Sequence, residues 1–341
     1  MSKMINSWSQ MRYFKLLIIA VVLVGLILLG LFSASGFLSL LIIMIIYSIY
    51  ALAYDLLLGY ANQPSLGHSL FFGLGAYGMV LPVLHWEWGF WAALGMALLA
   101  GAVGGLVVGF LAVRVTEAYH VILTALIASV VFLLAKNATP LTGGSGGLSF
   151  NVPPVVFGPV KLSVYDPETN FFLVLAFGLA VYLFLRRLVG TPLGRIWVGI
   201  RENENRMVSL GYNVYYYKLA AFIAASMLTA LAGALYAVRL RYVSAEFFDF
   251  MWSVLPFIWV IVGGIGTLAG PIVGVVLFTV FQIYVSDWWT HYLILFGVLI
   301  LAVLRWAPKG VMGYVNNWLN TRNARVGDKH GGSSASHLKG Y

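Results

Sequence analysis

A serine flanked by glycines is the one pattern in this sequence that is typical of a catalytic nucleophile. Gly143, Ser145 and Gly147 fit the spacing G-x-S-x-G, and His291 downstream would complete a Ser–His dyad. Such a pair would make the chain an intramembrane serine protease. The match is weak, because a five-residue pattern arises easily by chance among 37 glycines. Ser145 also falls in a proline-rich segment and not at the start of an apolar helix.

Other catalytic and metal-binding patterns do not occur in the sequence. The chain has no cysteine, which excludes disulfides, thiolate catalysis and cysteine-ligated metals. Its six histidines are scattered without metal-ligand spacing, so we interpret His68 and His120 as helix-end or packing residues and expect no metal. No phosphate-binding Walker motif occurs, and we therefore expect no ATPase site and no cofactor in this chain.

The composition is that of a membrane protein with several spans. Hydrophobic residues make up 61% of the chain, charged residues 9%, and the mean hydropathy is +0.93. A soluble domain carries about 25% charged residues. Since a span needs about 20 apolar residues, we expect an all-α polytopic membrane protein with about ten transmembrane helices. The apolar run after Lys15 lacks a small-residue cleavage site, so we interpret it as a retained first span.

The net charge of +9 is explained by the membrane and needs no nucleic acid. If the polar segment 191–211 is cytoplasmic, 16 of the 20 basic residues lie on the cytoplasmic side. The other four are Lys136, Lys161, Arg239 and Arg241. An excess of Lys and Arg in cytoplasmic loops is the rule for membrane proteins. The asymmetry therefore predicts that both termini are cytoplasmic.

This topology divides the chain into a cytoplasmic N-terminus (1–14), a transmembrane domain (15–311) and a polar tail (312–341) that we expect to be largely disordered. The prolines of the outer loop 137–169 exclude one continuous helix there. Gly101, Gly105 and Gly109 predict a face for close helix packing. The predicted spans are 15–33, 37–58, 66–84, 89–113, 118–136, 171–188, 218–238, 252–265, a span ending near 285, and 290–305.

Two glycine- and proline-containing breaks interrupt the apolar sequence, at 59–67 and 263–271. Unwound backbone at membrane depth is tolerated only against protein or a watery cavity. We expect polar side chains at these breaks to line a solute pathway, with the equal alternative that they only satisfy the broken backbone. A span precedes each break. In this topology the second span (37–58) runs inward and the seventh (218–238) runs outward, so we hypothesise two inverted four-helix repeats. The pathway candidates are Asp55, Asn62, Gln63, Ser65, His68 and Thr267.

The segment 191–211 is polar and charged between two apolar runs, and it predicts an amphipathic helix at the membrane surface. Thr191 is a candidate N-cap before Pro192, and Gly211 fits the position after the last helical residue. Glu202 and Arg206 have the spacing of an ion pair. The segment is either a solvated connection or a docking element for a cytoplasmic partner. Ile196, Ile200, Met207 and Leu210 form its predicted apolar face.

Two long runs, within 59–77 and 199–236, resemble the LivM-type membrane subunit of branched-chain amino acid ABC importers. The first run contains Gly-Tyr-Ala-Asn-Gln-Pro-Ser-Leu-Gly-His, in which the family usually carries glycine at the position of Asn62. The second begins with Gly-Ile-Arg-Glu-Asn-Glu-Asn at 199–205. A Thr-Gly-Gly-x-x-Gly-Leu element at 142–148 is also similar, and the resemblance extends over about 37–311.

The resemblance implies a type II-like ABC importer permease in the bacterial cytoplasmic (inner) membrane, with 191–211 as its coupling helix. It implies three kinds of partner: a homologous LivH-type permease subunit, two cytoplasmic ATPase subunits that bind ATP and Mg, and a periplasmic solute-binding protein. That protein would dock on 137–169 and 239–250. The implied solutes are branched-chain amino acids, other amino acids, amides or urea. The residues expected to contact the ATPase are Arg195, Arg201, Glu202, Asn203, Glu204 and Arg206.

A second class of function stays open beside this one. A self-contained secondary transporter would need a titratable group near the middle of the membrane for ion coupling. Asp55 is the only acidic residue well inside a predicted span. The two classes differ in what Asp55 must do, because only the secondary transporter needs its proton to come and go.

Overall fold

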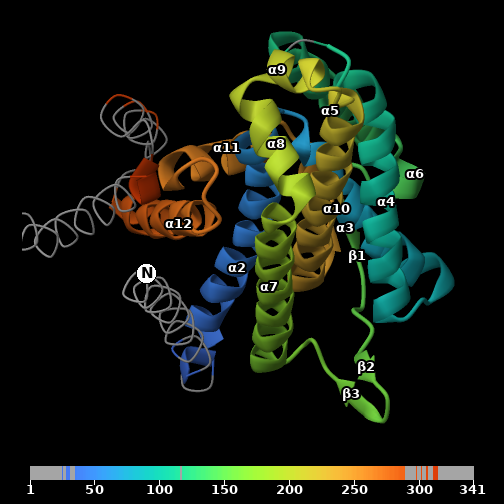
Figure 1. Ribbon diagram of the computed structural model, residues 1–341. Coiled ribbons are helices and arrows are strands. Elements are labelled where there is room, and N and C mark those ends of the chain that lie inside the picture. The colour runs from blue at the N-terminus through green and yellow to red at the C-terminus, as the bar shows by residue number, and fades with distance from the viewer. Residues whose placement is uncertain are drawn as a thin grey trace, which may run out of the picture.

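The computed structural model describes residues 25, 28–30, 35–115, 117–288, 297, 301, 305 and 310–313. Within this part of the chain the fold is a bundle of apolar helices (Figure 1). The N-terminus 1–14 and His291 lie outside the described residues, as do most of the predicted spans 15–33 and 290–305 and nearly all of the tail 312–341. Among the described residues, six helices are long and apolar enough to cross a membrane: α2 with η1 (Ser35–Asp55, Leu56–Tyr60), α3 (His68–Trp86), α4 (Phe90–Ala112), α5 (Glu117–Asn137), α7 (Pro167–Gly190) and α10 (Val214–Leu240).

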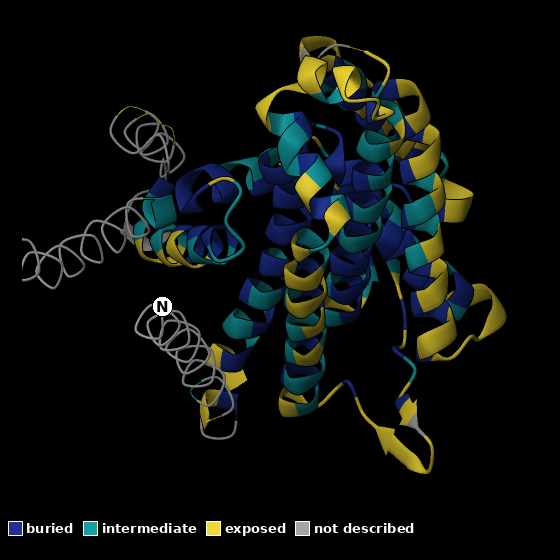
Figure 2. Cartoon of the chain, in the orientation of Figure 1, coloured by how far each residue is buried: buried dark blue, intermediate teal, exposed yellow. Residues whose placement is uncertain are grey.

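Helix α10 is the centre of the bundle and packs most extensively against α3 and α4. Close approach requires glycine here, because a side chain at Gly75 would collide with the backbone of Ala230. The predicted glycine stripe of α4 is confirmed as a packing face, since Gly101 and Gly105 lie directly against Ser226 of α10. Figure 2 shows that burial is concentrated in this centre, whereas α5 and the outer face of α4 are widely exposed.

A cluster of aromatic rings fills the space between α2, α3, α10 and α11 (Met251–Gly263). Tyr47 stacks on Trp259 at a centroid distance of 4.9 Å, and Phe72 stacks on Trp252 at 4.8 Å. The hydroxyl of Tyr50 donates to the carbonyl of Trp252 at 2.7 Å. Ring stacking and this hydrogen bond fix α11 against the bundle.

The second predicted break, 263–271, is confirmed as the turn between α11 and α12 (Gly270–Trp288). The predicted segment 252–265 corresponds to α11 within two residues at each end. Helix α11 has 13 residues, about 20 Å at 1.5 Å per residue, while a bilayer core is about 30 Å thick. The two helices pack on each other and against α2, at one side of the bundle in Figure 1.

Short strands join the two segments that were predicted to lie on the outer side. Strand β1 (Leu148–Ser149) pairs with β4 (Tyr242–Val243), and 3-10 helix η2 (Ala245–Phe248) follows β4. Strands β2 (Val155–Phe157) and β3 (Val160–Leu162) form a hairpin that projects from the end of the bundle opposite α8 and α9 (Figure 1). The loop 137–169 therefore contains, as its prolines predict, several short elements, the first being α6 (Thr139–Thr142).

Candidate functional site

The polar segment 191–211 forms two helices, where the sequence predicted one. Helix α8 (Pro192–Glu202) ends at Asn203, which is extended, and α9 (Glu204–Ser209) begins there. The side chain of Asn203 accepts a hydrogen bond from the N–H of Arg206 at 2.9 Å. An asparagine that caps a new helix stops the preceding one, and this explains the break.

The ends of the segment follow the prediction in part. Pro192 occupies the first turn of α8, and Gly211 has a left-handed φ of 88° after α9. Thr191 is not a side-chain cap, because its hydroxyl donates to the carbonyl of Leu188 at 2.6 Å. Leu210, predicted on the apolar face, is exposed because the break at Asn203 turns α9 away from the face of α8.

Trp197 anchors the segment to the bundle. It is 1% exposed, and its indole N–H donates to the carbonyl of Tyr217 at 2.8 Å. Ile200, one turn further along α8, is also buried. Buried tryptophan normally finds a partner for its N–H, so this contact fixes α8 on the start of α10.

The charged residues of the segment divide into an outward and an inward group. Glu202 and Arg206, predicted as an ion pair, lie on different helices because of the break. Glu204 pairs instead with Lys218 of α10, with 2.7 Å between the carboxylate and ammonium groups. The side chain of Lys218 is 12% exposed and that of Glu204 is 46% exposed. Of the six residues expected to contact the ATPase, five are exposed: Arg195, Glu202, Asn203, Glu204 and Arg206.

Arg201 is the one charged residue of the segment that we assign to the inward group, because its guanidinium points into the bundle. It is only partly exposed, and it donates a hydrogen bond to the carbonyl of Gly59 in η1, the π-helical continuation of α2. A hydrogen bond from a charged donor is among the stronger interactions in a protein. The segment 191–211 is therefore tied to the first break by a side chain as well as by packing.

The two predicted breaks meet at this point. Asp55 is fully buried, and its carboxylate accepts the N–H of Gly266 at 2.8 Å. Gly59 lies between them, where a Cβ atom would collide with the carboxylate and with the backbone of Gly266. We call Asp55, Gly59, Arg201 and Gly266 the break junction. It joins α2, α8 and the α11–α12 turn.

Thr267 closes the second break locally. Its hydroxyl donates to the carbonyl of Gly264 at 2.7 Å and accepts the N–H of Gly270 at 3.2 Å. Both of its roles as donor and acceptor are thus used by the backbone of the turn. This geometry matches the alternative in which a polar residue at a break satisfies unwound backbone.

Ser65 and His68 are packed inside the first break. The carbonyl of Ser65 accepts the Tyr54 hydroxyl at 2.8 Å, and its own hydroxyl oxygen accepts the N–H of Gly67 at 3.3 Å. His68 is fully buried among the rings of Tyr54, Phe71 and Phe222. Among the described residues, no cluster of His, Asp or Glu could hold a metal ion.

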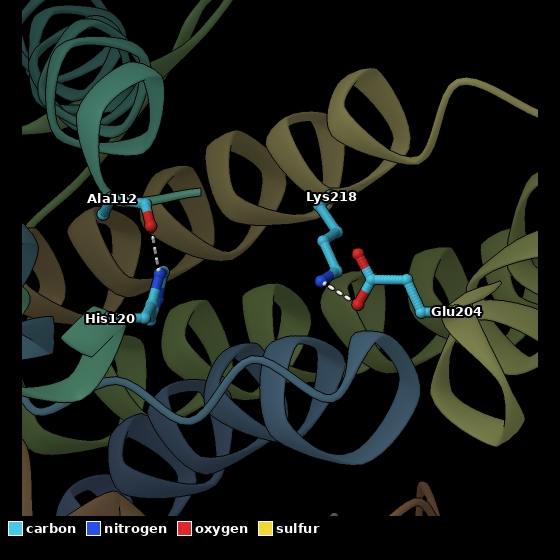
Figure 3. A network of polar contacts seen from close by, with 4 residues as sticks. All are labelled: Ala112, His120, Glu204 and Lys218. Carbon is cyan, nitrogen blue, oxygen red and sulfur yellow. Dashed lines mark hydrogen bonds and ion pairs between the residues drawn. The ribbon is translucent and has the colours of Figure 1, made fainter. Parts of the chain in front are cut away.

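Asn62 and Gln63 of the same break line a cavity of about 400 Å³ beside α9. Its other walls are the turn after α4, His120 of α5, and the Glu204–Lys218 pair. Figure 3 shows His120 on one side of this region and the ion pair on the other. The structure thus divides the six pathway candidates between the break junction, the α11–α12 turn, the packed core and this cavity.

The backbone of Asn62 is left-handed, with a φ of 51°. Glycine adopts this conformation freely and asparagine tolerates it, whereas a β-branched residue does not. We predict that Asn62→Gly keeps the thermal stability of the purified protein, whereas Asn62→Val lowers the free energy of unfolding by about 1–2 kcal/mol. Thermal denaturation in detergent measures this. If both variants lose the same free energy of unfolding, contacts of the asparagine side chain, and not its backbone conformation, stabilise this position.

Ser145 does not resemble a nucleophile in an active site. It is exposed in the glycine loop, whose Gly144 carbonyl accepts the N–H of Ala245 at 3.1 Å and whose Gly146 carbonyl accepts the Tyr242 hydroxyl at 3.1 Å. The loop therefore connects β1 to the segment after α10. His291, the proposed partner, lies outside the described residues.

A bundle of apolar helices, with two broken helices that meet inside it and a polar segment that contacts them, defines a polytopic membrane protein of the transport class. Comparison with known proteins gives the family. Residues 36–304 match the family described as "Branched-chain amino acid transport system / permease component". The chain belongs to this family of membrane permeases, whose role is transport and not catalysis.

Three relatives carry LivM names. The chain is 30% identical over 298 residues to the "High-affinity branched-chain amino acid transport system permease protein LivM" of Escherichia coli (strain K12), covering 82% of this chain and 70% of that protein. The Salmonella typhimurium protein of the same name is 30% identical, covering 82% and 71%. A "Probable branched-chain amino acid transport permease protein LivM" of Methanocaldococcus jannaschii is 27% identical, covering 64% and 67%. No solved structure matches the chain.

Proposed function

We propose that this chain is one membrane subunit of an ATP-driven ABC importer that moves branched-chain amino acids, or related small amino acids and amides, by alternating access. The names of the three relatives support the substrate class. The main support for the mechanism is the hydrogen bond of Arg201. It connects the segment 191–211 to the carbonyl of Gly59, beside both breaks. A force applied to α8 from outside the membrane would reach the breaks through this side chain.

In this proposal 191–211 is the cytoplasmic coupling helix, within a permease domain of 15–311. Its exposed Arg195, Glu202 and Arg206 would contact an ATPase subunit. The complex would contain a LivH-type permease and two ATPase subunits, which bind ATP and Mg. A periplasmic solute-binding protein would dock on the opposite end, where β1 and β4 join 137–169 to 239–250. The termini 1–14 and 312–341 would be cytoplasmic in the bacterial inner membrane.

The proposal retains two inverted repeats and ten spans, among which the short helix α11 would cross only part of the bilayer core. The two breaks belong to different halves of the chain and meet at the break junction, as an interface between repeats requires. A secondary transporter is less well supported, because the Asp55 carboxylate already accepts the N–H of Gly266. That bond gives Asp55 a structural role without a change of protonation.

Purification of the chain from its native membrane in mild detergent tests the proposal. We expect a second permease and ATPase subunits to co-purify. The reconstituted complex should take up leucine only when ATP and the solute-binding protein are supplied. Recovery of the chain alone, moving solute in proteoliposomes without ATP, would contradict the proposal and favour a secondary transporter.

A charge exchange separates two roles of Glu204, contact with the ATPase and contact with Lys218. If the pair with Lys218 matters, Glu204→Lys should lower ATP-driven uptake, and the further change Lys218→Glu should restore part of it. We expect an interaction energy of about 0.5–1 kcal/mol between the two sites, since the pair is partly exposed. Uptake by both single variants and the double variant gives this value. Full loss in the double variant would assign Glu204 to the ATPase alone.

A further inference from the structure

The cavity beside α9 is separate from the break junction and has a mixed lining. Its apolar walls are Pro64, Val113 and Val115. The polar groups come from five different parts of the chain: the first break, the turn after α4, α5, α9 and α10. A volume of about 400 Å³ lies in the range of small-molecule sites.

Two buried side chains in the lining have polar atoms that lack hydrogen-bond partners among the described residues. Gln63 is 4% exposed, and neither atom of its side-chain amide has a partner. His120 is 3% exposed, and its Nε2 also has none. Buried polar groups are nearly always satisfied, so unsatisfied groups that line a cavity indicate that a ligand or water completes them.

The hydrogen bonds of His120 define what its free nitrogen can do. Nδ1 lies 2.8 Å from the carbonyl of Ala112, and a carbonyl only accepts, so Nδ1 carries a proton (Figure 3). In the neutral ring Nε2 is then an acceptor. With the Glu204 carboxylate, the cavity thus has two acceptors for a cation.

Complementary groups for an anion lie in the same cavity. The ammonium of Lys218 faces it, and the amide of Gln63 offers two N–H donors. Arg114 lies at the exposed rim, with its guanidinium 4.1 Å from the centroid of the Phe110 ring. The cavity therefore presents both signs of charge beside a small apolar wall.

We propose that this cavity binds a small apolar α-amino acid as its zwitterion. Its carboxylate would meet Lys218 and Gln63, its ammonium would meet Glu204 and Nε2 of His120, and its side chain would contact Val113 and Val115. Glu204 belongs to α9, so an occupied cavity competes with the Lys218 contact that connects α9 to α10. The site lets an amino acid on that side of the membrane act on the coupling segment. The choice of amino acid rests on the proposed function.

Equilibrium binding of tritiated L-leucine to the purified complex, without solute-binding protein, tests the inference. We expect saturable binding that Gln63→Leu and His120→Phe each weaken by at least about tenfold, because each removes a polar partner of the ligand. Gln282→Leu makes the same chemical change on α12, away from the cavity, and should leave binding unchanged. Unlabelled 4-methylpentanoate, which lacks the ammonium, and 3-methylbutylamine, which lacks the carboxylate, should compete poorly.

The outcomes separate this inference from the proposed function. If ATP-driven leucine uptake occurs but the complex binds no leucine, or binds it equally well in both cavity variants, the inference is wrong and the proposed function stands. If 4-methylpentanoate competes as well as leucine, the cavity is an anion site and the zwitterion assignment is wrong. If neither uptake nor binding occurs, both fail. Gel filtration of each variant confirms that the complex is assembled.

Discussion

Replacing Arg201 with alanine is expected to remove most ATP-driven transport while the complex stays assembled. The change deletes the charged donor to the Gly59 carbonyl and leaves Trp197 to hold α8 in place. A hydrogen bond to a charged group is worth about 1.5–3 kcal/mol, which corresponds to roughly 10- to 100-fold in the equilibrium that couples the two elements. Uptake in proteoliposomes and ATP hydrolysis, measured together, show whether the two have separated.

Two control variants sharpen the test. Arg201→Lys keeps a positively charged donor and should therefore retain part of the uptake. The retention is only partial because the lysine ammonium lacks the planar fork of donors that arginine has. Arg186→Ala removes an exposed arginine at the end of α7 and should have little effect. If Arg201→Ala imports solute at the normal rate per ATP hydrolysed, the contact with Gly59 has no role in coupling.

Substitution of Asp55 is expected to have the second large effect on transport. The comparison of Asp55→Asn, which keeps the shape of the side chain, with Asp55→Leu is the informative one. In Asp55→Leu the partly buried N–H of Gly266 loses its acceptor, which we expect to cost about 1–3 kcal/mol and to separate the two breaks. We expect transport to be lost and the α11–α12 turn to loosen. Asp55→Asn retains a side-chain oxygen that can accept the same N–H, so most transport should remain. Uptake by both variants, beside a thermal denaturation of each, measures the difference.

The variant Asp55→Asn also distinguishes an ATP-driven importer from a secondary transporter. A secondary transporter that couples to protons needs a carboxyl group that titrates, and Asp55→Asn would abolish its transport completely. An ATP-driven importer needs only the hydrogen bond. Complete loss of uptake in an otherwise stable Asp55→Asn protein would therefore contradict our interpretation of the break junction.

Much of the architecture could be predicted from the sequence, because apolar runs of span length directly indicate helices in a membrane. The break at 263–271, the α4 glycine face and the irregular loop 137–169 were predicted from local composition. The bounds of α11 were also predicted to within two residues, because the glycine-rich turn marks where its apolar run ends. The meeting of Asp55 with Gly266 joins residues 211 positions apart. No local pattern contains that information.

The segment 191–211 shows what a helical pattern misses. Asn203 could have been recognised as a cap followed by an acidic first turn, but the apolar spacing on both sides favoured one continuous helix. Trp197 lies three residues before Ile200, on the same face, and was the available signal for the anchor. Lys218 and the inward direction of Arg201 depend on the packing of α8 against α10, so they required the structure.

The central claim is that the segment 191–211 contacts an ATPase and transmits its motion to the breaks. Photocrosslinking tests it most directly, with a photoreactive amino acid placed at exposed positions 195 and 202 in native membranes. We expect covalent adducts with the ATPase subunit from both positions, and none from position 160 in β3 at the opposite end of the bundle (Figure 1). If positions 195 and 202 give no ATPase adduct in a complex that is transporting solute, the segment is not the coupling helix and the account is wrong.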